Sequence, residues 1–136
     1  MSVGILLISH NRIGAELLAT ARETLGFCPV RTRTLEITQD DDPVARTRKA
    51  MELCRLLDDG DGVLVLTDAC GSTPSNIAAR LVRDQPVTVI AGLNLPMLLR
   101  VFNYPGLDRR ALAAVALAGG TDGVVEVTSY PGEGEF

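Results

Sequence analysis

The sequence predicts a doubly wound α/β domain, in which a mostly parallel sheet of four strands has helices on both faces. The C-terminal part of the chain is expected to add one further strand at an edge of this sheet. Two observations favour this class. Continuous apolar runs of branched residues, typical of strands buried on both faces, alternate along the chain with stretches of helical spacing. The 136 residues, of which 46% are hydrophobic and 22% charged, are enough to form one globular domain.

The first apolar run predicts a central strand that begins at Val3 and ends at His10, the single histidine of the chain. Residues 12–25 follow with apolar side chains on one helical face, and Gly26 is expected to end that helix. We expect Asn11 to cap the helix. The imidazole would then lie beside free backbone N–H groups at the positive end of a helix dipole, which is a place that suits a phosphate.

Residues 30–37 alternate in a way that predicts a strand near an edge of the sheet, and three adjacent aspartates, Asp40 to Asp42, come next. At first sight these carboxylates indicate a metal site, but the spacing of a loop ligand set is missing. An aspartate directly before Pro43, at the start of a predicted helix over 43–57, is better explained by helix capping and dipole pairing. We therefore predict a cap and no metal at this turn.

A second unbroken apolar run over 63–66 predicts another central strand, and Asp68 follows it as His10 follows the first. The small-residue loop 69–76 leads into a predicted helix over 77–82. Gly71 permits close approach of a backbone, so the loop resembles an anion cradle, although it lacks the lysine and the glycines of a P-loop. Hydroxyl groups in this loop belong to Ser72, Thr73 and Ser75.

The remaining third of the chain continues the alternation. We predict a strand over 87–91, helices over 97–102 and 108–117, a break at the glycines of 119–123 and a last strand over 124–128. Asn94, after the fourth strand, is expected to bond nearby main chain. The domain is assigned to residues 1–130, and residues 131–136 are expected to form a flexible tail.

Composition excludes several classes of function. A net charge of −4 and the absence of tryptophan argue against nucleic-acid binding, which depends on Lys and Arg and often on aromatic stacking. Cys28, Cys54 and Cys70 are odd in number and lack metal-ligand spacing. The N-terminus shows no leader pattern, and no apolar stretch reaches the ~18 residues that span a bilayer. We therefore expect a cytoplasmic, reduced protein with no membrane insertion.

Three ordered motifs carry a resemblance to a known family. They read ISHN at residues 8–11, LVLTDACGSTPSN at 64–76 and AGLNLPML at 91–98. Together they resemble the mannose-family IIA components (EIIA type 4) of the bacterial phosphoenolpyruvate-dependent sugar phosphotransferase system. The resemblance covers about residues 3 to 128, and three motifs in order are far more specific than a lone histidine.

The resemblance implies a role for each motif. In that family the histidine after the first strand accepts a phosphoryl group from the phosphocarrier protein HPr, and the aspartate after the third strand orients it. These roles map onto His10 and Asp68. The family loop usually reads Gly-Gly-Ser-Pro, whereas residues 71–74 read Gly-Ser-Thr-Pro, so that Thr73 keeps a hydroxyl and Ser72 replaces a glycine. The resemblance also implies a homodimer, in which exchange of the C-terminal strand between subunits is one arrangement.

The chemistry of these residue types fits such a role. Imidazole is a nitrogen nucleophile that is largely neutral near pH 7, and a carboxylate that accepts the Nδ1 hydrogen leaves Nε2 free to attack. Helix N-terminal amides and hydroxyl groups supply the positioning that phosphoryl transfer needs, and no metal or cofactor is required. We predict a catalytic pair of His10 and Asp68. The predicted phosphate-binding residues are Asn11, Gly71, Ser72, Thr73 and Ser75.

Several functions stay open at this point. The first is a phosphocarrier that passes the phosphoryl group from HPr through His10 to a IIB-type acceptor, with peripheral association to a permease. The second is a stand-alone regulatory module whose partner binding is switched by phosphorylation of His10. The third is a small phosphate-ligand binder that uses the Gly71 loop. The phosphodonor subunit of a dihydroxyacetone kinase is a related alternative, although that protein usually carries extra domains.

Overall fold

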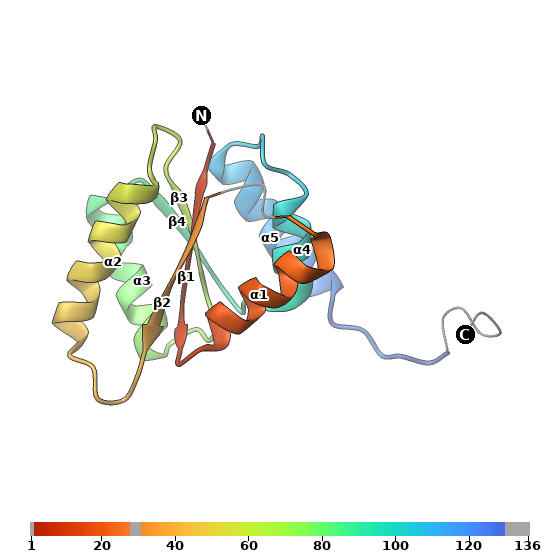
Figure 1. Ribbon diagram of the computed structural model, residues 1–136, viewed down its shortest axis with the longest axis horizontal. Coiled ribbons are helices and arrows are strands. Elements are labelled where there is room, and N and C mark those ends of the chain that lie inside the picture. Colours follow the sequence, from red (N-terminus) through yellow and green to blue (C-terminus); the bar gives the residue numbers. More distant parts are fainter. Residues whose placement is uncertain (1, 28–30, 130–136) are drawn as a thin grey trace.

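Four parallel strands form the centre of the computed structural model, which describes residues 2–27 and 31–129, and their order across the sheet is β2-β1-β3-β4. The predicted α/β class is confirmed, and β1 and β3 are the two central strands (Figure 1). The strands are β1 (Gly4–His10), β2 (Thr32–Ile37), β3 (Val63–Thr67) and β4 (Val87–Ala91). The helices are α1 (Ile13–Leu25), α2 (Pro43–Leu57), α3 (Thr73–Asp84), α4 (Leu95–Phe102) and α5 (Arg109–Asp122).

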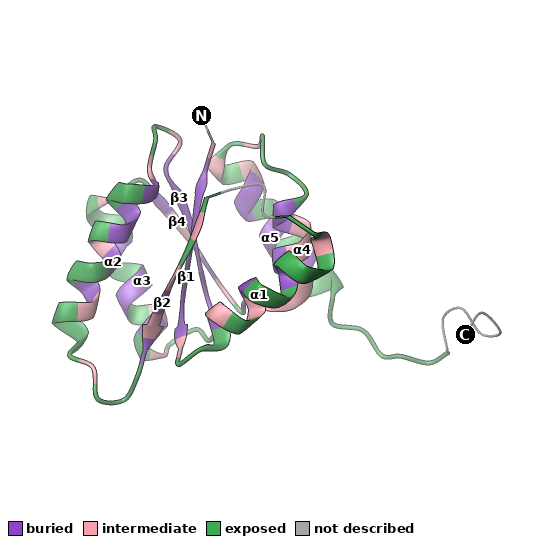
Figure 2. Ribbon diagram, viewed as in Figure 1, coloured by how far each residue is buried: buried purple, intermediate pink, exposed green. Residues whose placement is uncertain are grey.

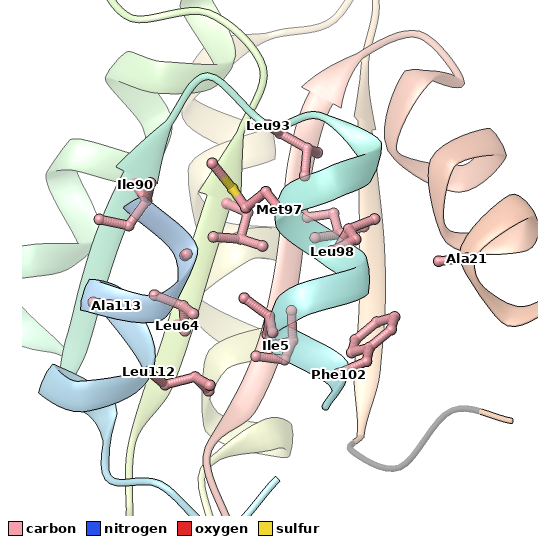
Figure 3. Packing of buried hydrophobic residues seen from close by; sticks show 14 of the residues in the cluster. Ile5, Ala21, Leu64, Ile90, Leu93, Met97, Leu98, Phe102, Leu112 and Ala113 are labelled. Carbon is pink, nitrogen blue, oxygen red and sulfur yellow. The ribbon is translucent and has the colours of Figure 1, made fainter. Parts of the chain in front are cut away.

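Successive residues of the central strands are buried in two different hydrophobic clusters. Ile5 and Leu7 of β1 pack with α1, α4 and α5, whereas Leu6 and Ile8 face the layer formed by α2 and α3. Figure 2 shows the buried strands between the two helix layers, and Figure 3 shows Ile5 beside Phe102 and Leu98 of α4. This alternation is the period of two that a strand imposes on its side chains. Full burial of a Leu or Ile side chain contributes about 1.5–3 kcal/mol, so the sheet core holds the two strand ends in fixed places.

Most predicted boundaries lie within a few residues of those observed. Helix α2 spans the predicted 43–57, and Gly26 ends α1 in the left-handed conformation with φ 78°. Helices α3 and α4 begin two to four residues earlier than predicted, each with a proline in the first turn. Proline is compatible with that position because its missing N–H has no partner there in any case. Residue 30, the predicted start of the second strand, lies outside the described residues.

Helix α5 continues through Gly119 and Gly120, two of the glycines that were predicted to end it, and ends at Asp122 before Gly123. A Cβ atom on Gly119 would lie 2.9 Å from the Cβ of Arg100, and one on Gly120 would lie 2.8 Å from the Cε of Met97. Both neighbours belong to α4, so the glycines permit close packing of two helices. The break was therefore wrong at Gly119 and Gly120, because tertiary packing outweighs the low helix propensity of glycine.

The described residues after α5 form no strand within the single chain. Val124, Val125 and Val127 are 77, 69 and 78% exposed. This segment leads away from the sheet (Figure 1), so the strand predicted over 124–128 has no neighbouring strand of its own chain with which to pair. The tail predicted over 131–136 lies outside the described residues. Among the helices of the described part, none has the length and apolar character required to span a bilayer.

Candidate functional site

The topology brings the ends of β1 and β3 together. The two strands are parallel neighbours, with Ile8 opposite Thr67 in the register, so the residues that follow them share one edge of the sheet. The chain order reverses between these strands, because β2 lies on one side of β1 and β3 on the other. Ligands of open α/β sheets bind outside the carboxyl ends of the strands at such a switch point.

His10 and Asp68 are in direct contact at this edge. Asp68 Oδ2 lies 2.7 Å from His10 Nδ1 and also accepts the backbone N–H of His10 at 3.1 Å. The second carboxylate oxygen, Oδ1, accepts the N–H of Ala69 at 3.1 Å. The Asp68 side chain is only 10% exposed, whereas that of His10 is 43% exposed. A fixed carboxylate therefore orients an accessible ring, and a carboxylate partner favours the tautomer with hydrogen on Nδ1.

The start of α1 differs from the predicted arrangement. Asn11 does not cap the helix; it adopts a positive φ of 47°, and its N–H donates to the carbonyl of Ile37 at 2.9 Å. The N–H of Gly14 donates instead to Ser9 Oγ at 2.8 Å. The prediction was wrong because the turn after β1 points Asn11 to solvent and places the buried Ser9 hydroxyl under the first helical turn.

Ser9 is thus a residue of the candidate site that the sequence reasoning missed. Its hydroxyl holds the strand-to-helix turn on which His10 lies, and a Cβ on Gly14 would come within 3.0 Å of that hydroxyl. A serine at the end of an apolar strand, directly before the histidine and five residues before a glycine, is the signal that was present.

The loop after β3 is organised by its own small residues. Gly71 has a φ of 83°, which glycine adopts readily, and its N–H donates to Ser75 Oγ at 3.3 Å. The Ser72 hydroxyl donates to the carbonyl of Ala69. Thr73 is exposed at the first position of α3, and no hydrogen bond of its hydroxyl occurs within the described residues. Two of the predicted phosphate-binding hydroxyls are therefore used inside the loop, whereas the Thr73 hydroxyl has no partner in the part of the chain that the structure describes.

All the predicted site residues lie at the end of β1 or in the two segments that follow β1 and β3. His10 and Asp68 touch one another, while Asn11 is in the first segment and residues 71–75 are in the second. Ser72 precedes α3 without a side-chain capping bond. Because an α-helix leaves its first N–H groups without partners, the start of α3 carries hydrogen-bond donors and a positive dipole end at this edge.

Asn94, after the end of β4, holds main-chain segments together. Asn94 Oδ1 accepts the N–H of Met97 at 2.9 Å, and Nδ2 donates to the carbonyl of Gly120 at 3.1 Å, as expected for an asparagine that ties main chain together. The Thr67 carbonyl accepts the N–H groups of Gly92 and Leu93. In contrast, the buried Thr67 hydroxyl has no hydrogen-bond partner among the described residues.

The acidic turn before α2 is a helix cap, as predicted. Asp42 Oδ1 accepts the N–H of Val44 at 3.1 Å. Asp41 Oδ2 accepts the N–H of Thr38 at 2.7 Å, and this backbone hydrogen bond, helped by Arg46, lowers the pKa of Asp41. Across the described ranges, no group of three or more His, Cys, Asp or Glu side chains is arranged to hold a metal ion.

The two described cysteines have different surroundings. Cys70 is exposed two residues after Asp68, whereas Cys54 is buried in α2. Burial, together with the nearby Asp58, raises the pKa of the Cys54 thiol to about 11. Because the thiolate is the reactive form, this burial and raised pKa disfavour reaction of Cys54. Cys28 lies outside the described residues.

Comparison with known proteins gives consistent matches. The family model EIIA-man, described as PTS system fructose IIA component, matches residues 4–116. The mannose-specific EIIAB component of the phosphotransferase system of Escherichia coli K12 is 30% identical over 138 residues, which cover 98% of this chain and 42% of that protein. The chain therefore spans less than half the length of this curated relative.

Solved structures agree in fold over nearly the whole chain. The mannose/sorbose-specific IIA subunit from Enterococcus faecalis superposes with a TM-score of 0.85 at 27% identity, covering 96% of this chain and 98% of that one. The PTS IIA protein associated with the fucose utilization operon of Streptococcus pneumoniae gives a TM-score of 0.74 at 26% identity, covering 93 and 96%. Since the family model also matches most of the sequence, the chain belongs to the EIIA-man family of phosphotransferase-system IIA components.

Proposed function

We propose that this IIA component is a phosphocarrier, in which Nε2 of His10 accepts a phosphoryl group from an HPr-like protein and passes it to a IIB-type acceptor. The observation that carries the proposal is the 2.7 Å contact between His10 Nδ1 and Asp68 Oδ2. This contact occupies one ring nitrogen and leaves the other for attack on phosphorus.

Each step of the transfer has a place in this geometry. As the bond between phosphorus and the donor breaks, the lone pair of Nε2 forms a new N–P bond, and positive charge develops on the ring. The proton on Nδ1 stays there, where the Asp68 carboxylate stabilises the charge. The second transfer reverses these changes, because the acceptor takes the phosphoryl group and the ring returns to its neutral form.

The transferred group would also meet hydrogen-bond donors. The first N–H groups of α3 and the Thr73 hydroxyl lie in the segment after β3, beside the end of β1. Amides at a helix N-terminus and an aligned dipole favour phosphate oxygens. With 43% of its side chain exposed, His10 is accessible to a docking protein at this edge.

The partners follow from the relatives. The curated relative is named a mannose-specific EIIAB component, and we propose that a IIB-type unit takes the phosphoryl group from His10. The proposed location is the cytoplasm, with peripheral association to a sugar permease. A regulatory protein switched by His10 phosphorylation would accept the phosphoryl group but would not pass it to IIB.

A homodimer is part of the same proposal. The outer edge of β4 has no strand beside it within the described residues, and Val124, Val125 and Val127 are exposed. We infer that residues 124–128 pair with β4 of a second copy, which would bury these valines and complete the edge. The double variant V125K/V127K should then shift the mass in solution from dimer to monomer, while a monomeric wild type would contradict exchange.

Phosphate incorporation tests the central step. Incubation with phosphoenolpyruvate, enzyme I and HPr should add one acid-labile, base-stable phosphate to the wild type and none to His10→Ala. Addition of a IIB protein should then remove the label from the wild type. Label that stays on His10 would favour regulation over transfer, and equal labelling of His10→Ala would contradict the proposal.

A further inference from the structure

A second concave surface lies between α2 and α3, on the face of the sheet opposite α1, α4 and α5 (Figure 1). This α2–α3 groove has a volume of about 580 Å³. It is lined by Thr47, Met51, Ala79, Arg80, Arg83 and Asp84. The groove opens to solvent, and neither His10 nor Asp68 lines it.

The rim of the groove is cationic. Arg80 and Arg83 are exposed, and neither forms an ion pair within the described residues, where Asp84 is the one carboxylate of the lining. On α2, Arg48 and Arg55 lie three residues before and four residues after Met51, so they flank it on the same helical face. These two are likewise exposed and without an ion pair in the described part.

This local excess of positive charge contrasts with the chain as a whole, whose net charge is −4. Arg80, Arg83 and Asp84 are the charged residues of the groove lining, and Arg48 and Arg55 lie beside Met51 on α2, where the neighbouring Glu52 is paired with Lys49. Unpaired like charges repel each other, so their concentration has a small cost to the folded state that an anionic partner would relieve.

The floor of the groove is apolar. Met51 is half-buried and Ala79 presents only a methyl group. The hydroxyl of Thr47 donates to the carbonyl of Pro43 at 2.7 Å, so it is already satisfied. A flexible thioether adapts to different apolar side chains and is common at binding surfaces of this kind.

We propose that the α2–α3 groove binds an acidic amphipathic helix of a partner protein. A furrow between two helices accepts a convex helix, whose apolar face would cover Met51 and Ala79. Its carboxylates would pair with the guanidinium forks of Arg80 and Arg83. A lipid surface would leave such a concave floor uncovered, so the shape favours a protein segment. This inference does not depend on phosphorylation of His10.

Titration of the ¹⁵N-labelled full chain with a defined peptide tests the proposal. The probe is an amphipathic helix of about four turns, with Leu on one face and Glu flanking that face. On addition of this peptide, the largest amide shifts of the labelled chain should be those of Thr47, Met51 and Ala79. A peptide with Lys in place of Glu should not bind. The variant R80E/R83E should weaken binding by about tenfold or more.

The matched control is R22E/R33E, which changes the net charge equally with two exposed arginines on α1 and β2. It should keep the wild-type affinity, and both double variants should accept phosphate at the wild-type rate. Peptide shifts outside the groove, or equal weakening by both variants, would overturn the proposal. Binding to phosphatidylglycerol vesicles that R80E/R83E abolishes, with no peptide binding, would overturn it in favour of a membrane surface.

Discussion

The helices of this protein begin in two different ways. Four of them have a side chain that accepts an N–H of the first turn. Ser9 does so for α1, and the N-cap residues Asp42, Asn94 and Asp108 do so for α2, α4 and α5. The fifth, α3, is preceded by Ser72, whose side chain makes no capping bond. Helix α3 follows β3 and Asp68, beside the end of β1 at which His10 lies.

Because α3 lacks a side-chain cap, backbone N–H donors at its start are free to bind a ligand. A side-chain cap contributes about 1 kcal/mol to stability, and an aspartate cap also adds negative charge at the helix start. Both effects would oppose phosphate at the start of α3. The buried Thr67 hydroxyl, directly before Asp68, is a further polar group without a partner in the described residues. Polar groups without hydrogen-bond partners in the described residues therefore lie close to the candidate site, at the start of α3 and at Thr67.

The largest expected effect is that of Asp68→Asn. An amide cannot supply the charge that stabilises the ring, so phosphoryl acceptance should slow by about 10²–10⁴-fold, as measured with labelled HPr. Asp61→Asn is the control, because Asp61 precedes β3 at the other end of the sheet. An unchanged rate in Asp68→Asn would break the proposed link between the contact and catalysis.

Ser72→Asp would turn the start of α3 into one of the capped kind. The carboxylate should accept N–H groups of the first turn and raise the free energy of unfolding by about 0.5 kcal/mol. It should also repel phosphate oxygens and slow phosphoryl acceptance by about tenfold. Ser72→Asn should cap the helix without adding charge, so the difference in rate between the two variants measures the electrostatic effect of the carboxylate on phosphoryl acceptance. A faster or unchanged rate in Ser72→Asp would show that the phosphoryl group does not meet this helix.

Asp108→Ala removes a cap far from the site. Asp108 Oδ1 accepts the N–H of Ala111 at 2.8 Å, so the variant should lose about 1 kcal/mol of unfolding free energy in urea titrations. Phosphoryl acceptance should stay at the wild-type rate. A large loss of rate without loss of stability would contradict the division of the helices into two kinds.

The smallest expected effect is that of Thr67→Val. Replacing a buried, unpartnered hydroxyl with a methyl group should raise the free energy of unfolding by about 0.5–1 kcal/mol. Thr47→Val is the matched control, since its hydroxyl donates to Pro43, and this change should instead lower stability. If both variants lose stability equally, Thr67 has a partner in solution.

Features that depend on local pattern could be predicted from the sequence. The apolar runs of β1 and β3 predicted two central strands, and their polar endings predicted that His10 and Asp68 would meet. The Asp-Pro pair at residues 42 and 43 predicted a helix start that the structure confirms. In each case neighbouring residues determine the geometry.

Features that depend on tertiary contacts could not be predicted. The cap of α1 comes from Ser9, because the path of the turn decides which hydroxyl reaches the N–H of Gly14. Helix α5 passes through Gly119 because α4 packs against it. The strand expected over 124–128 requires a neighbouring strand, which the single chain does not provide.

The most direct test of the account is the position of the phosphoryl group on the ring. The chain has one histidine, so ¹H–¹⁵N correlation spectra of ¹⁵N-histidine-labelled protein report on His10 alone. After phosphorylation through HPr, the account predicts phosphorus on Nε2 and a retained hydrogen on Nδ1, next to Asp68. Phosphorus on Nδ1, or a phosphorylated protein with an unmodified ring, would contradict it.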